Sequence, residues 1–156
     1  MTAGVLHSIN VSNGGVPKLA VPFARVTLNS VAGDRQRDLR HHGGAQRAVS
    51  LFSLELIRAL QAEGHPIQVG TIGENFTLSS IEWNRLVPGV ILRAGEVELE
   101  MTSYAEPCGN IAGSFSDRRF TRVSHKLHPG WSRLYARVLK EGTVRRGDAC
   151  RLMPPS

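Results

Sequence analysis

Apolar and acidic side chains alternate along the segment Val97–Ser103, which carries the clearest pattern in the chain. A period of two is expected for a strand with one buried face, so this segment is predicted to be a half-buried β-strand. The dipeptide Ala94-Gly95 separates it from a second apolar run, Val90–Arg93. Short turns that contain glycine favour hairpins, and we therefore expect these two segments to pair.

Short apolar runs interrupted by turn residues make up most of the remaining sequence. Sixteen glycines and eight prolines separate these runs, which is typical of many short strands joined by turns. Six further strands are predicted, at Val5–Val11, Arg25–Leu28, Ala48–Leu51, Asn75–Leu78, Leu134–Lys140 and Ala149–Met153.

One segment has the pattern of an α-helix. Ser53 is suited to the N-cap, Glu55 to the first turn and Gly64 to the end of this helix. Its apolar face should pack on the sheet through three residues at helical spacing, Leu56, Ile57 and Leu60. A second short helix is expected at Ser114–Phe120. Many strands with one or two short helices indicate the α+β fold class, with a β-rich and closed or nearly closed barrel.

Length and composition fit a single domain. The chain has 156 residues, of which 41% are hydrophobic, so we expect one domain, 1–156, with a substantial core. The apolar runs are far shorter than the ~20 residues that a bilayer requires. The N-terminus lacks the charged head and apolar run of a signal peptide. With two cysteines and no export signal, the sequence indicates a reducing, cytoplasmic compartment.

The chain is strongly basic. Its formal net charge is +6 and its pI is about 10.1. This excess favours an anionic partner, which could be a phosphate-bearing cofactor, an acidic protein or a nucleic acid. The basic residues are dispersed and aromatic residues are only 6% of the chain, which argues against nucleic acid because base stacking needs aromatic platforms.

A thiol directly follows the alternating strand, in the dipeptide Pro107-Cys108. The proline imposes an extended or turn conformation on the approach to Cys108 and removes a backbone donor, which suits a presented side chain. Cys150 lies within a short apolar strand instead and is expected to be a small buried hydrophobe. Two cysteines do not indicate a disulfide framework.

Two polar segments are further candidates for binding. Between Gly33 and Arg47 the chain carries arginines whose planar forks match phosphate oxygens, but a polar loop of mutually paired Asp and Arg residues would look the same. The segment Gly73–Thr77 could present an amide to a heterocycle, or it could be ordinary turn chemistry.

Four motifs occur in a specific order along the chain. They are Gly-Asp-Arg-Gln-x-Asp at 33–38, His-Gly-Gly-x-x-Arg-Ala at 42–48, Gly-Glu-Asn-Phe at 73–76 and Pro-Cys-x-Asn at 107–110. This arrangement resembles the MOSC domain family, named for the C-terminal domain of molybdenum cofactor sulfurase, and it is most similar to the small stand-alone bacterial members. The resemblance extends from about Val5 to Met153.

The resemblance implies a barrel-like α+β domain that binds the molybdenum cofactor, molybdopterin. Cys108 matches the family cysteine that serves as a thiolate ligand to molybdenum or as a sulfur carrier, so it is the expected catalytic residue and metal ligand. The resemblance also implies a phosphate site, to which we assign Arg35 first and Arg47 second. Ser12 and Lys18, in the loop after the first strand, are further candidates.

The remaining cofactor-binding assignments also follow from the resemblance. Asn75 stands where relatives present a polar group to the pterin. Asp34, His42 and Gly43 are expected to shape the wall of the pocket. A role for His42 in proton transfer is an alternative to this structural one.

The expected function is that of a reductase component acting on N-hydroxylated or related small molecules. Electrons would come from a separate protein, because an iron–sulfur cluster needs four cysteines. One alternative is a sulfur carrier that forms a persulfide on Cys108, supplied by a cysteine desulfurase; another is a non-catalytic anion-binding module. A Cys–His hydrolase would need His41 or His42 beside Cys108. A zinc site built from these residues and Cys150 lacks the short paired spacings of zinc motifs.

Overall fold

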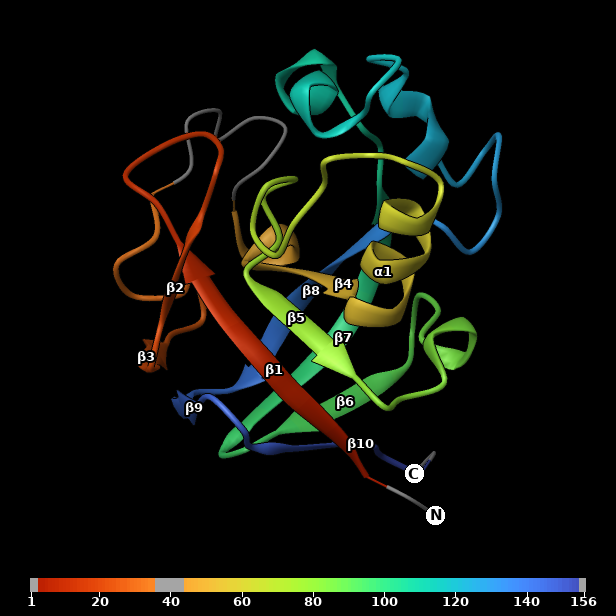
Figure 1. Ribbon diagram of the computed structural model, residues 1–156. Helices are drawn as coiled ribbons and strands as arrows, with labels where there is room; N and C mark the ends of the chain where they lie inside the picture. The colour runs from red at the N-terminus through yellow and green to blue at the C-terminus, as the bar shows by residue number, and fades with distance from the viewer. Residues whose placement is uncertain (1–2, 36–43, 155–156) are drawn as a thin grey trace.

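Seven strands close into a barrel in the computed structural model, which describes residues 3–35 and 44–154 (Figure 1). The strands are β1 (Gly4–Val11), β4 (Val49–Ser53), β5 (Phe76–Ser79), β6 (Ile91–Ala94), β7 (Val97–Ala105), β8 (Arg133–Lys140) and β10 (Ala149–Leu152). They follow one another around the barrel in the order β10-β6-β7-β8-β4-β5-β1, and pairing of β1 with β10 completes the ring. The predicted β-rich α+β barrel is therefore confirmed.

Three further strands lie outside this ring. Strand β2 (Leu19–Val21) extends the sheet beside β1, and β3 (Phe23–Val26) pairs with β9 (Gly142–Arg145) in a separate two-stranded sheet. The sequence did not predict β2 or β9. Strand β2 has only three residues and no buried side chain, so it carries no alternation that could have revealed it.

The predicted hairpin is present and supplies much of the core. Strands β6 and β7 pair in antiparallel fashion with Ala94 opposite Val97, and Gly95 in the turn has a φ of 56°. The apolar positions of β7 are buried, whereas Glu98 and Glu100 between them are partly exposed. Alternation along the strand therefore directs apolar side chains into the barrel, as expected for a half-buried strand.

The predicted helix is also present, as α1 (Leu54–Ala62). The Ser53 hydroxyl accepts a hydrogen bond from the Leu56 amide at 3.2 Å, which satisfies one of the free amides of the first turn. Ile57 and Leu60 are buried in a second apolar cluster outside the barrel. Figure 1 shows α1 beside β4 and β5.

The helix expected at Ser114–Phe120 is wrong. Two 3-10 helices flank this segment instead, η3 (Gly109–Ser114) and η4 (Phe120–Val123). Phe115 between them is extended and buried in the second apolar cluster, which interrupts any continuous helix. Short 3-10 helices also occur at η1 (Ala45–Arg47) and η2 (Trp83–Arg85). The described part of the chain holds no helix with the length and apolar character needed to cross a membrane.

Candidate functional site

A buried polar network lies on the outer face of the barrel where β1, β4 and β5 meet. Alternation turns most apolar residues of these strands inward, so the positions between them face outward, and several of these are polar. Asn10, Ser50 and Asn75 are almost inaccessible to solvent. Buried polar groups normally need hydrogen-bond partners, and each of these side chains has them.

Asp34 is the acceptor at the centre of this network. The Lys18 ammonium lies 2.7 Å from each of its carboxylate oxygens. The backbone amide of Ser12 donates to Asp34 at 2.9 Å, and the Asn75 side chain donates at 2.9 Å. The side chains of Lys18 and Asp34 are only 9% and 2% exposed, so the charge of Lys18 is neutralised inside the protein.

The Asn75 amide uses its whole hydrogen-bonding capacity within the protein. Its oxygen accepts from the Ser50 backbone amide at 3.0 Å and from the Ser50 hydroxyl at 3.2 Å. Its nitrogen donates to Asp34 and to the Asn10 carbonyl, the latter at 3.2 Å. Asn75 therefore joins three segments of the chain. Direct contact between this amide and a ligand stays a prediction, and it requires exchange of one of these bonds.

Glu74 is a fully buried carboxyl that the sequence analysis did not select. One of its oxygens accepts from the Gly70 amide at 3.1 Å and from the Thr77 hydroxyl at 3.0 Å. The other oxygen is buried and has no partner among the described residues. Burial raises the pKa of Glu74, against the opposite effects of these hydrogen bonds and of the nearby Arg133 charge. Glu74 therefore holds its proton more tightly than an exposed glutamate does.

Arg133 is the second residue that sequence reasoning missed. It is 6% exposed, and its buried Nε atom has no hydrogen-bond partner within the described ranges. A Cβ atom on Gly73 would lie 3.8 Å from Arg133 Nη1 and 3.9 Å from Lys18 Cε. Because Lys18 is paired with the Asp34 carboxylate, Arg133 is the second cationic side chain close to Gly73. A guanidinium of this kind suits an anionic oxygen.

The predicted phosphate ligands Arg35 and Arg47 lie at the margins of the network. The Arg35 amide donates to the Ser12 carbonyl at 2.7 Å, and this residue is exposed. The Arg47 guanidinium carbon lies 5.2 Å from the ring centroid of Tyr135. Tyr135 is opposite Ser50 in the β4–β8 ladder, which places Arg47 beside the network.

The structure therefore brings together most of the predicted binding residues. Ser12, Lys18, Asp34 and Asn75 share one hydrogen-bond network, and Arg35 joins it through its backbone. The predicted pocket residues His42 and Gly43 lie outside the described residues, as does His41.

Cys108 and Cys150 have opposite environments. Cys108 is partly exposed at the N-cap of η3, and its thiol has no hydrogen-bond partner among the residues that the structure places. Cys150 is fully buried, and this burial raises its pKa to about 12, which confirms it as a structural residue. The ladder between β7 and β8 sets Ala105 opposite Arg133. The three residues from Ala105 to Cys108 span at most about 11 Å, so the backbone of Cys108 lies within about that distance of Ala105.

No group of three or more His, Cys, Asp or Glu side chains within 3–35 and 44–154 could hold a metal ion by itself. A metal bound through Cys108 therefore finds no complete ligand set among these described residues, and a cofactor with its own sulfur ligands would leave one position for the protein to fill. Such an arrangement requires only one soft thiolate ligand from the protein.

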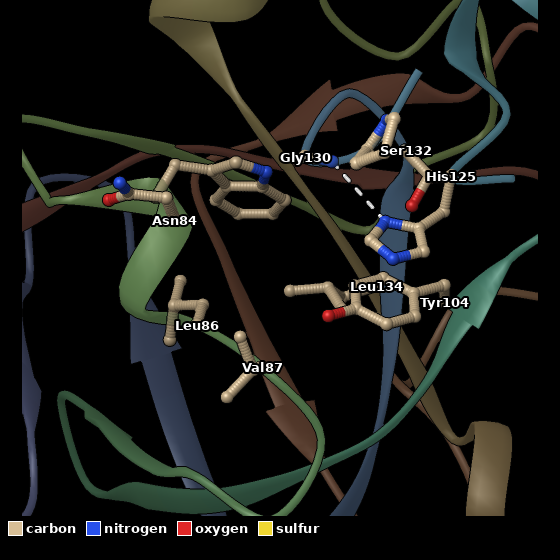
Figure 2. Close-up of a pocket in the computed structure, with 10 residues that line it drawn as sticks. Asn84, Leu86, Val87, Tyr104, His125, Gly130, Ser132 and Leu134 are labelled. Atoms are coloured by element: carbon tan, nitrogen blue, oxygen red, sulfur yellow. Dashed lines mark hydrogen bonds between the residues drawn. The ribbon is translucent and has the colours of Figure 1, made fainter. Parts of the chain in front are cut away.

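A pocket of about 250 Å³ opens on the other side of β8 (Figure 2). Ser132 and Leu134 line it, whereas Arg133 between them approaches Gly73. The rings of Tyr104 and His125 are stacked at its wall, with centroids 3.5 Å apart and planes 5° apart. The sequence analysis assigned no role to this part of the chain, because no motif marks it.

Comparisons with known proteins agree with this architecture. A family model described as the MOSC domain matches residues 38–151. YflK of Bacillus subtilis strain 168 is 28% identical over 122 residues, which are 78% of this chain and 54% of YflK. The chain therefore spans about half the length of that relative.

Solved structures show a common fold at low sequence identity. YiiM from Geobacillus stearothermophilus has a TM-score of 0.74 and 23% identity, over 97% of this chain and 75% of YiiM. The YUAD protein from Bacillus subtilis has a TM-score of 0.76 and 18% identity, over 100% and 98% of the two chains. YiiM from Escherichia coli has a TM-score of 0.70 and 17% identity, over 100% of this chain and 72% of that one.

Proposed function

Because the chain belongs to the MOSC domain family, which is associated with molybdenum cofactor-related proteins, we propose that it binds the molybdenum cofactor and that Cys108 is the thiolate ligand to the metal. The observation that carries this proposal is the position of a free, partly exposed thiol just beyond the β-strand that pairs with Arg133. We further propose that the protein is a reductase component for N-hydroxylated or related small molecules.

The residues present fit the two chemical ends of this cofactor. A soft thiolate such as that of Cys108 is a suitable ligand for a sulfur-rich molybdenum centre. The phosphate end needs donors in a site of positive potential, and Arg133 supplies a buried guanidinium whose Nε atom has no hydrogen-bond partner among the described residues. Arg47, which stands over Tyr135, and Arg35 would add to this positive potential from the margin.

The buried network would hold these groups in position. Asp34 holds the Lys18 ammonium in an ion pair. The Asn75 side chain donates a hydrogen bond to Asp34, which connects this pair to the residue just before β5. Gly73 has a φ of +90°, and a Cβ atom there would lie 3.2 Å from Val16 Cγ1 and in ordinary contact with Arg133 Nη1 and Lys18 Cε, so a side chain at this position would crowd Val16 first. When bound, the cofactor would supply two-electron redox chemistry, while the protein would position the reactants and limit water access.

A separate protein would deliver the electrons. The full sequence has two cysteines, and Cys150 is sealed in the core. Most iron–sulfur clusters are held by four cysteines, and we therefore propose that an electron-donor partner supplies the electrons.

A sulfur-carrier function is the second candidate, favoured by the same free thiol. The Cys108 thiolate would attack the terminal sulfur of a cysteine desulfurase persulfide. The donor S–S bond breaks, Cys108 gains the sulfur, and the desulfurase cysteine leaves as a thiolate. Intact-mass analysis after incubation with desulfurase and free cysteine tests this, because a carrier gains one sulfur atom at Cys108 and a pure metal ligand gains none.

Elemental analysis tests the main proposal. Wild type, Cys108→Ser and Cys150→Ala are purified without oxygen from a host that makes the cofactor, and molybdenum and pterin are measured per chain. We expect molybdenum in wild type and Cys150→Ala and its loss in Cys108→Ser. Equal, negligible molybdenum in all three proteins overturns the proposal. Anion binding that persists without any molybdenum would then favour a non-catalytic anion-binding module.

A further inference from the structure

We propose that the pocket of Figure 2 binds a small, uncharged aromatic molecule that carries a carboxamide-like group. Its lining residues are Trp83, Asn84, Leu86, Val87, Tyr104, His125, Pro129, Gly130, Ser132 and Leu134. This binding proposal stands on the pocket itself and does not require a metal.

The residues that line the pocket disfavour a charged ligand. None of its residues is Lys, Arg, Asp or Glu, although these make up 21% of the chain. A charged group in such a site loses its hydration without gaining an ionic partner, which is costly. An uncharged ligand is therefore the better match.

Two aromatic surfaces of the pocket are held rigidly. Trp83 makes an edge contact with the buried ring of Phe52, with centroids 6.1 Å apart and planes at 86°. Tyr104 is stacked on His125, whose Nδ1 atom accepts a hydrogen bond from the Gly130 amide at 3.2 Å. Fixed aromatic walls favour a planar ring, because little side-chain freedom is lost when it binds.

The polar groups of the pocket indicate a donor and an acceptor on the ligand. Since Nδ1 of His125 accepts from Gly130, the neutral ring carries its proton on Nε2 and can donate there. The Ser132 hydroxyl donates to the Arg133 carbonyl at 3.0 Å, so it is left as an acceptor. A carboxamide complements both, with its oxygen toward His125 and its N–H toward Ser132.

The pocket size limits the ligand to about one ring with a substituent. Its volume is about 250 Å³. A cavity of about 150 Å³ holds benzene, and drug-sized ligands occupy roughly 300–1,000 Å³. Tyr104 is four residues before Cys108, a span of at most about 14 Å, so a bound molecule would lie near the proposed metal ligand.

Fluorescence of Trp83 offers a direct test. The chain has two tryptophans, so Trp131→Phe leaves Trp83 as the sole reporter. This variant is titrated with benzamide, with cyclohexanecarboxamide, which lacks the aromatic ring, and with benzoate, which is charged. We expect saturable quenching by benzamide and affinities at least about tenfold lower for the other two. No saturation with benzamide, or equal affinity for all three compounds, overturns the proposal.

Two matched variants locate the binding in the same background. Ser132→Ala removes the acceptor with little change of volume and should weaken benzamide binding about fivefold. The affinity for N,N-dimethylbenzamide, which has no N–H to donate, should be almost the same in this variant as in its parent. Leu127→Ala, at an exposed residue outside the lining, should leave benzamide binding unchanged. Equal losses in both variants, or none in Ser132→Ala, contradict the proposal. Cys108→Ser should bind benzamide normally whether or not it holds molybdenum, which separates this test from that of the metal site.

Discussion

The Lys18 ammonium lies 2.7 Å from each oxygen of the Asp34 carboxylate, and both side chains are nearly inaccessible to solvent. These residues are 16 positions apart, so their contact joins the loop after β1 to the start of the Gly33–Arg47 segment. Arg133 also lies close to Gly73, and its buried Nε atom has no hydrogen-bond partner among the described residues.

Removing the Asp34 charge should destabilise the fold. Asp34→Asn keeps the shape of the side chain but leaves the Lys18 ammonium buried without a counter-charge, which we expect to cost roughly 3 kcal/mol or more. Urea unfolding of Asp34→Asn, Lys18→Met and the double variant measures the coupling between the two residues. A double variant as unstable as the sum of the single ones would contradict a specific pair.

Glu74 should make stability depend on pH. Its folded-state pKa is raised above the ordinary value of 4.5 by burial, so the folded protein holds this proton more tightly than the unfolded chain does. The contribution of Glu74 is then fully present below about pH 4.5 and is lost as pH rises through the folded pKa. Glu74→Gln lacks this titration, so its stability relative to wild type should increase with pH. A difference in the free energy of unfolding between Glu74→Gln and wild type that stays constant from about pH 4 to 8 would contradict this prediction, because glutamates in proteins titrate in roughly that range.

The two thiols should differ in reactivity. Cys108 is partly exposed, whereas Cys150 is fully buried with its pKa raised to about 12. Brief treatment of the native protein with iodoacetamide should therefore add one group, at Cys108, as located by peptide mass spectrometry. Denatured protein should take up two. Labelling of Cys150 under native conditions, at a rate similar to Cys108, would show that the core assignment is wrong.

Gly70 is predicted to be intolerant of a side chain. Its φ is +83°, and a Cβ atom there would lie 2.1 Å from the Lys18 carbonyl oxygen. Gly89 is a matched control, since its φ is +96° and its Cβ would meet nothing within 4 Å. Both alanine variants carry the conformational cost of about 1–2 kcal/mol, but Gly70→Ala must also displace the 16–18 loop. Thermal unfolding should show a larger loss for Gly70→Ala, and equal losses would contradict the close approach.

Much of the fold could be predicted from local sequence patterns. The alternation in Val97–Ser103 and the cap at Ser53 depend on neighbouring residues only, and both elements are present. Strand β2 was missed because its three residues pair with β1 at an exposed edge. The expected helix at Ser114–Phe120 failed because Phe115 is buried by packing against distant residues.

The candidate site could be predicted only in part, for the same reason. The ordered motifs selected Asp34 and Asn75, which share the buried network, and Cys108, whose role as a ligand stays a prediction. Arg133 looks like an ordinary surface residue in the sequence, and the Gly-Glu-Asn-Phe motif contains Glu74 without showing that its carboxyl is buried. Both side chains are buried in the folded protein. Their importance comes from that burial, which no local pattern reports.

The sulfur environment of the metal tests the central claim most directly. Wild type and Cys108→Ser are both loaded with excess molybdenum cofactor without oxygen, and X-ray absorption at the molybdenum edge counts the sulfur ligands of each. The account predicts one sulfur ligand fewer in Cys108→Ser than in wild type. The same sulfur count in both proteins would contradict the assignment of Cys108 as the ligand.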